Sequence, residues 1–109
     1  MTVLANPDTC PVTAAVALVG GKWKVSILWR LSQGSRHFGA LRRSVAGVSE
    51  RVLATQLRAL EADGLVLRTV HARGDGGVPR RVDYALTPRG EALVPALNAL
   101  ADWAREHPA

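Results

Sequence analysis

Five segments of the chain have the pattern of α-helices. In most of them apolar side chains recur every three or four residues, the spacing that places these side chains on one face of a helix. These segments are residues 11–19, 22–32, 38–45, 50–63 and 88–106. In the fourth segment Leu53, Leu57 and Leu60 form such a stripe. Ser49 before it is a favoured N-cap residue, and Gly64 stands where helices commonly end. The pattern therefore predicts five helices.

Two further segments, residues 66–72 and 80–86, are rich in Val, Thr, His, Tyr and Leu, a composition typical of strands. The glycine-rich residues 73–79 between them indicate a hairpin with a flexible tip. Thr87 and Pro88 then provide an N-cap and a first helical position. The predicted order is α-α-α-α-β-β-α, in which the third and fourth helices form a helix-turn-helix. The fold class is therefore mainly α with a small β-hairpin, a winged helix-turn-helix.

A length of 109 residues fits one domain with one core. We expect residues 1–10 to form an N-terminal arm and residues 11–106 to form a single DNA-binding and dimerisation domain. The formal net charge is +5, from 14 Lys and Arg against 9 Asp and Glu. A small basic domain attracts polyanions, so double-stranded DNA is the partner to consider first.

Several other classes of protein do not fit the sequence. Cys10 is the single cysteine, which excludes an intramolecular disulfide framework and suits a reducing compartment. The N-terminus lacks a signal-peptide pattern, and the longest apolar stretch, residues 14–19, is too short to span a bilayer. We therefore expect a cytoplasmic protein without a membrane partner.

An enzyme is also not expected. His37, His71 and His107 are scattered over three elements and show neither metal-ligand nor catalytic-triad spacing with Cys10. The glycine pairs lack the strand-loop-helix pattern of a phosphate-binding loop. The sequence thus predicts no catalytic residue, no metal and no cofactor.

The fourth helix carries the predicted DNA-reading residues. At 100° per residue, Arg51, Thr55 and Arg58 lie about 140–200° from Leu53, on the face opposite the leucine stripe. In a major groove, Arg can bind guanine and Thr can offer its hydroxyl or methyl group. Ser49 and Gln56 flank this face, where a phosphate or an adenine edge could be reached. A solvated helix face without a ligand is the alternative for these residues.

Other arginines are expected to position the protein on DNA. Arg73, Arg80 and Arg81 cluster at the hairpin tip, with only Asp75 opposing their charge. A flexible arm with Arg at its tip can enter the minor groove or straddle phosphates. Arg42 and Arg43, together with Arg36, are expected to contact phosphates or to serve as surface charge.

Several motifs follow one another along most of the chain: Cys10-Pro11-Val12, Gly20-Gly21-Lys22-Trp23, and residues 38–43, 47–49, 57–65 and 82–90. In these motifs and in their order the chain resembles the HxlR-type bacterial transcriptional regulators. The resemblance implies a homodimer joined through the N-terminal and C-terminal helices and bound to palindromic promoter DNA. The glycine-rich tip at residues 73–77 departs from the family's usually short, Pro-containing hairpin tip.

Dimerisation is also suggested by the apolar residues themselves. Leu93, Leu97, Leu100 and Trp103 of the last helix, added to the very apolar residues 11–19 and 22–32, exceed what a small domain can easily bury. We expect the second segment to be deeply buried, in part by a second chain. A compact monomer core is the alternative.

Cys10 is a candidate sensing residue. Just before Pro11 it would lie at a helix N-terminus, where the dipole favours a thiolate that reacts with oxidants or electrophiles. The resemblance implies the same, because several members of the family use a cysteine at this position. A small apolar residue packed at the helix start is the alternative.

Two other function classes remain open from the sequence. A winged helix that serves as a protein-interaction module would use an apolar face and show little salt dependence, whereas DNA binding weakens steeply as salt rises. A small thiol enzyme acting through Cys10 would turn over a thiol substrate.

Overall fold

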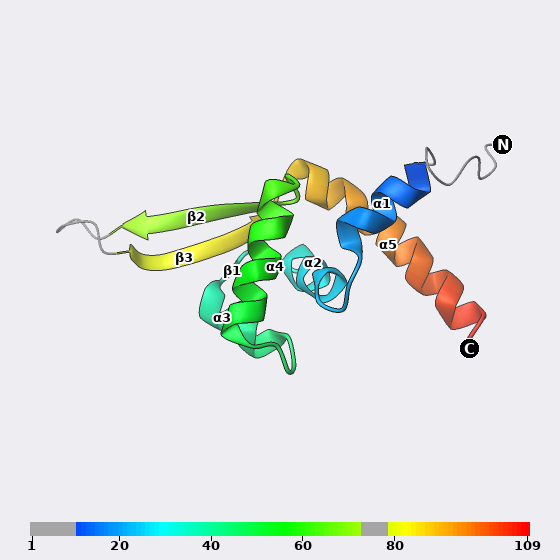
Figure 1. Ribbon diagram of the computed structural model, residues 1–109, viewed down its shortest axis with the longest axis horizontal. Helices are drawn as coiled ribbons and strands as arrows, with labels where there is room; N and C mark the ends of the chain where they lie inside the picture. Colours follow the sequence, from blue (N-terminus) through cyan, green and yellow to red (C-terminus); the bar gives the residue numbers. More distant parts are fainter. Residues whose placement is uncertain (1–10, 73–78) are drawn as a thin grey trace.

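The computed structural model describes residues 11–72 and 79–109 (Figure 1). Its helices are α1 (Pro11–Val19), α2 (Lys24–Ser32), α3 (Phe38–Ser44), α4 (Glu50–Ala62) and α5 (Pro88–Glu106). Its strands are β1 (Arg36–His37), β2 (Val66–Ala72) and β3 (Pro79–Leu86). The predicted fold class, a mainly α winged helix-turn-helix with a β-hairpin, is confirmed.

The strand β1 is a feature that the sequence pattern does not predict. It pairs with β3 through Arg36↔Tyr84 and His37↔Asp83, and the antiparallel sheet has the order β1-β3-β2. Two residues are too short to show an alternation of polar and apolar positions, so β1 depends on pairing with β3. The helix α2 also begins at Lys24 rather than at residue 22, after Gly21 with φ of 99°.

The core lies where α2, α3 and α4 pack together and against the sheet. The side chains of Leu53, Leu57 and Leu60 are at most 1% exposed, so the predicted stripe of α4 is its inner face. Ile27, Leu28 and Leu31 from α2 are buried against the same cluster. This packing fixes α4 along one side and leaves its opposite side free for a ligand.

The junction between α4, β2 and α5 is held by hydrogen bonds of the Thr87 side chain and by a close approach at Gly90. Gly64, with φ of 75°, ends α4, and the Thr87 hydroxyl donates to the Gly64 carbonyl at 2.5 Å. The same hydroxyl accepts from the Gly90 N–H at 3.0 Å, which caps α5 as expected. A Cβ atom at Gly90 would lie 2.2 Å from the Leu65 carbonyl oxygen. Only glycine therefore lets α5 approach the start of β2 this closely.

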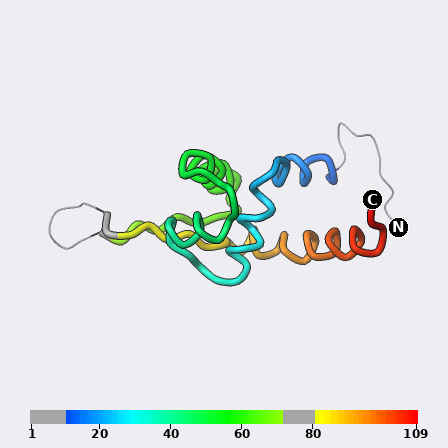
Figure 2. Tube along the Cα trace, turned by 90° about the horizontal axis from the view of Figure 1, so that it is seen from below, coloured from blue at the N-terminus to red at the C-terminus, as the bar shows by residue number. Residues whose placement is uncertain are grey.

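The strands β2 and β3 form the hairpin that is called the wing below. The helices α1 and α5 extend away from the wing, on the other side of the core (Figures 1 and 2). No residue of α1 is buried, and Leu100 and Trp103 of α5 are 63% and 59% exposed. Val25 and Trp29 are 41% and 49% exposed, so this chain alone does not bury residues 22–32 as deeply as expected, and their burial by a second chain stays a prediction. These side chains belong to the outer face of α2, which no element of the same chain covers fully.

Candidate nucleic-acid interface

The helix α4 is the second helix of the helix-turn-helix. The Ser49 hydroxyl accepts a hydrogen bond from the Val52 N–H at 3.1 Å, so the predicted N-cap is present. Opposite the buried leucines, Arg51, Thr55 and Arg58 are exposed, as the helical spacing predicts. The Thr55 hydroxyl donates to the Arg51 carbonyl at 2.9 Å. Thr55 can therefore still offer an acceptor oxygen and a methyl group to a ligand.

The arginines of α3 are exposed beside α4. Arg42 Nη1 lies 3.7 Å from Glu50 Oε1 across the turn that joins the two helices, and both side chains are largely exposed. An exposed pair at this distance contributes little to stability, because water screens it. Glu50 therefore holds Arg42 only weakly, and both Arg42 and Arg43 are exposed and accessible to a polyanion.

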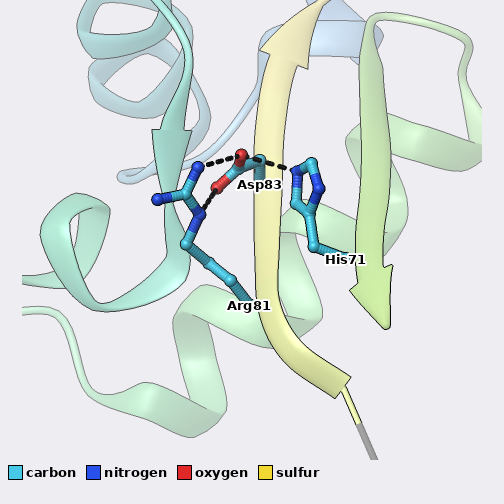
Figure 3. Close-up of polar contacts among 3 residues, drawn as sticks. All are labelled: His71, Arg81 and Asp83. Carbon is cyan, nitrogen blue, oxygen red and sulfur yellow. Dashed lines mark hydrogen bonds and ion pairs between the residues drawn. The ribbon is translucent and has the colours of Figure 1, made fainter. Parts of the chain in front are cut away.

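Arg81 is held by a carboxylate on the wing (Figure 3). Its Nε lies 3.0 Å from Asp83 Oδ1 and its Nη2 donates to Asp83 Oδ2 at 3.1 Å. His71 Nε2 lies 2.9 Å from the same Oδ2, on the neighbouring strand. The expectation that only Asp75 opposes the wing arginines is therefore wrong, because residues 81 and 83 lie on the same face of β3.

The contacts of Asp83 with Arg81 and His71 lower the pKa of its carboxyl group. Partial burial by itself raises that pKa. The hydrogen bonds and the charge attraction from Arg81 and His71 act in the opposite direction and outweigh burial, so the pKa lies below its usual 3.8. Asp83 is therefore ionised at neutral pH and orients Arg81 along the sheet.

Three predicted residues cannot be placed. Cys10 and Arg73 lie outside the described residues. The backbone of Arg80 belongs to β3, but its side chain is outside the described part of the structure. The sequence reasoning also missed Arg68, which is exposed on β2 and directly paired with Tyr84 on β3. Side chains alternate between the two faces of a sheet along each strand. This alternation along β2 and β3 could have predicted that the side chains of Arg68 and Tyr84 lie on the face of the sheet toward α4.

A second surface lies between α1 and α5. A hollow of about 240 Å³ separates the two helices, and its lining is almost entirely apolar. Its residues are Val12, Ala15, Val16, Val19, Leu93, Ala96, Leu97 and Leu100. Val12 and Val16 are 52% and 58% exposed. This surface, called the terminal-helix surface below, has the composition of a protein contact rather than of a nucleic-acid contact.

In residues 11–72 and 79–109, no three His, Cys, Asp or Glu side chains lie close enough together to hold a metal ion. Across the same ranges no single helix is both long and apolar enough to cross a membrane. The helices α1 and α2 pass that test only as a pair, and the pair is bent by 84°. The expectations of no metal and no membrane partner stay expectations.

A helix-turn-helix with an exposed Arg and Thr row on its second helix, next to a β-hairpin, defines the class of winged helix-turn-helix DNA-binding proteins. A family model described as HxlR-like helix-turn-helix matches residues 18–109. The chain therefore belongs to the HxlR-like helix-turn-helix family, and the resemblance seen in its sequence is confirmed.

Individual relatives agree with this assignment. The HTH-type transcriptional regulator YtfH of Escherichia coli K12 is 42% identical over 96 residues, which are 88% of this chain and 73% of that protein. The crystal structure of a transcriptional regulator from Enterococcus faecalis V583, described as of the MarR family, has a TM-score of 0.81 at 37% identity, covering 96% of this chain and 91% of that one.

The redox regulator HypR in its reduced form has a TM-score of 0.78 at 34% identity and covers 88% of this chain and 91% of that one. HypR is also similar in its oxidised form. The chain is thus a transcriptional regulator of the winged helix-turn-helix type, and none of these three relatives is described as an enzyme.

Proposed function

We propose that this protein binds a palindromic promoter site as a homodimer, with one α4 in each of two successive major grooves. The exposed row of Arg51, Thr55 and Arg58 opposite the buried leucines of α4 is the observation that carries this proposal. These three side chains face the base edges, and Ser49 and Gln56 flank them. Half-sites about 34–36 Å apart follow from the two-fold symmetry.

The remaining basic residues position the dimer. Arg42 and Arg43 lie next to α4 and contact phosphates on one side of the groove. On the other side the wing contributes Arg81, which Asp83 orients, together with Arg73 and Arg80. Phosphate contacts of this kind set affinity and register but carry little sequence information.

The terminal-helix surface supports dimerisation. The helices α1 and α5 expose Val12, Val16, Leu100 and Trp103, and contiguous exposed apolar residues are characteristic of protein contacts. In this proposal the same surface of a second copy covers them, as a two-fold axis requires. The domain boundaries follow: residues 11–106 act as one DNA-binding and dimerisation domain, and residues 1–10 form an arm.

Redox sensing by Cys10 is a separate part of the proposal. HypR, a similar protein, is described as a redox regulator. Cys10 directly precedes α1 in the sequence and Val12 of α1 lines the terminal-helix surface, so in this proposal oxidation of the thiol changes how two copies meet. Oxidation would require a cysteine of a second copy or a small thiol, because the chain has one cysteine.

The test is a titration of the reduced protein against a duplex from upstream of its own gene, with unrelated DNA as competitor. Arg51→Ala should weaken binding by about 1–3 kcal/mol and relax the preference for particular bases. Arg105→Ala, which removes the same charge at the far end of α5, should leave base preference unchanged. Repeating the titration after mild oxidation, with Cys10→Ser as the control, tests sensing.

Retained, salt-sensitive binding at two protomers per duplex supports a dimeric regulator. If Arg51→Ala binds every sequence as the parent protein does, α4 does not read bases. Binding that is insensitive to salt would favour the alternative of a protein-interaction module.

A further inference from the structure

A hollow of about 250 Å³ lies between α4 and the sheet, next to the row of proposed base-reading residues, with which it shares Arg58. It is lined by Ala54, Arg58 and Glu61 from α4, by Arg68 from β2 and by Tyr84 from β3. The three α4 positions are spaced by four and three residues, so they lie along one side of the helix. The hollow is therefore a gap between the reading helix and the base of the wing.

The strand register explains why Arg68 faces this hollow. Arg68 and Tyr84 are direct cross-strand partners, and partners in an antiparallel pair point to the same side of the sheet. Arg36 on β1 is the partner of Tyr84 on the other side, so the three residues form one row across the sheet. Tyr84 is 7% exposed, whereas Arg68 is exposed.

Positive charge exceeds negative charge in the lining of the hollow, with Arg58 and Arg68 against Glu61. Among the described residues, no carboxylate lies within 4.0 Å of a guanidinium nitrogen of Arg58 or Arg68, although Glu61 is part of the same lining. Two arginines on facing walls without close counter-charges form a site for an anion. The planar guanidinium group with its several donors suits phosphate oxygens in particular.

We propose that this hollow holds one backbone phosphate of the bound DNA, with Arg68 as its main ligand and Arg58 adding positive charge from the opposite wall. The inference depends on the proposed mode of DNA binding. When α4 lies in a major groove and the wing reaches toward the next minor groove, the sugar-phosphate strand between the two grooves passes between these elements. The hollow occupies that place.

The proposal gives Arg68 and Glu61 opposite effects on affinity. Arg68→Gln removes a charge-assisted contact and should weaken binding at least about tenfold, to the same extent on specific and unrelated DNA. The slope of log affinity against log salt should fall by about 0.9 for each phosphate, hence by about two for a dimer. Glu61→Gln removes a negative charge next to the phosphate and should tighten binding.

The decisive experiment replaces single phosphates of the duplex with neutral methylphosphonates, along the strand that flanks the α4 contact. At one position per half-site, the neutral linkage should weaken binding of the parent protein but leave binding by Arg68→Gln unchanged, because the contact is already absent. Arg51→Ala is the control and should respond to the neutral linkage as the parent protein does.

The outcomes separate this inference from the proposed function. If the parent protein does not bind its upstream duplex specifically, the proposed function fails. If it binds and Arg51→Ala relaxes base preference, but Arg68→Gln retains the affinity and salt slope of the parent protein, the phosphate site is wrong and the function stands. Arg68 is exposed on a strand, so circular dichroism should show both proteins equally folded.

Discussion

The two halves of the molecule bury their apolar residues to very different extents. In the half that contains α2, α3, α4 and the sheet, the large side chains of the core are almost fully buried, with Leu53 and Leu60 at 0% exposure. In the half formed by α1 and the end of α5, Leu100 remains 63% exposed and α1 buries no residue. One chain thus buries the core of the first half by itself, whereas the exposed apolar side chains of the second half fit the proposed contact between two copies.

The largest expected effect compares one leucine from each half. Leu57→Ala should lower the free energy of unfolding by roughly 2–5 kcal/mol, because it leaves a cavity in a close-packed core. Leu100→Ala should change the stability of a dilute monomer by no more than about 0.5 kcal/mol, because its side chain is exposed there. Leu100→Ala should instead weaken dimerisation.

Urea denaturation measures the first effect, and sedimentation equilibrium measures the second. A Leu100→Ala variant that dimerises as tightly as the parent protein would show that α5 is not part of the contact. A Leu57→Ala variant of unchanged stability would contradict the division into a half with a buried core and a half with exposed apolar side chains.

The next effect concerns the junction between the halves. Gly90→Ala should destabilise the protein by about 1–3 kcal/mol, because the new Cβ would meet the Leu65 carbonyl oxygen at 2.2 Å and α5 would have to move away from β2. Gly39→Ala in α3 is the matched control, since its Cβ would meet the flexible Arg43 side chain at 3.3 Å. Its stability should change little.

Thermal unfolding distinguishes the two glycine variants. A loss of 1 kcal/mol lowers the melting temperature by about 4–8 °C in a domain of up to roughly 100 residues. Equal melting temperatures for Gly90→Ala and Gly39→Ala would show that the close approach of α5 to β2 is not required.

The difference between the halves also limits what the sequence predicts. Local signals succeed: Ser49 and Thr87 cap their helices, and the helical spacing places Arg51, Thr55 and Arg58 opposite the core. These features depend only on residues within a few positions of one another. They therefore give the fold class and the exposed face of α4 on which the proposed base contacts lie.

Features that depend on pairing between distant segments are missed. The strand β1 forms only because it pairs with β3. The position of Arg68 across from Tyr84 follows from the register of β2 and β3. The contact of Arg81 with Asp83 is an exception, because it is local: the two residues lie two positions apart on one face of β3, and the grouping of Arg81 with the arginines of the hairpin tip left Asp83 out. How far Trp29 is covered also depends on what packs on the outer face of α2, and its burial by a second chain stays a prediction.

The smallest effect compares one carboxylate from each half under acid. Because the folded-state pKa of Asp83 is depressed, its ionised form stabilises the fold above the unfolded-state pKa, and this contribution is lost as pH falls through the folded-state value. The stability difference between the parent protein and Asp83→Asn should therefore be present at pH 7 and shrink below about pH 4. The control is Asp102→Asn in the half formed by α1 and the end of α5, where the partner of Asp102, Arg105, has a side chain that is 71% exposed. Urea midpoints at pH 7 and pH 3 measure the stability of both variants. If the stability difference between the parent protein and Asp83→Asn stays constant between these pH values, the Arg81–Asp83–His71 contacts do not stabilise the wing.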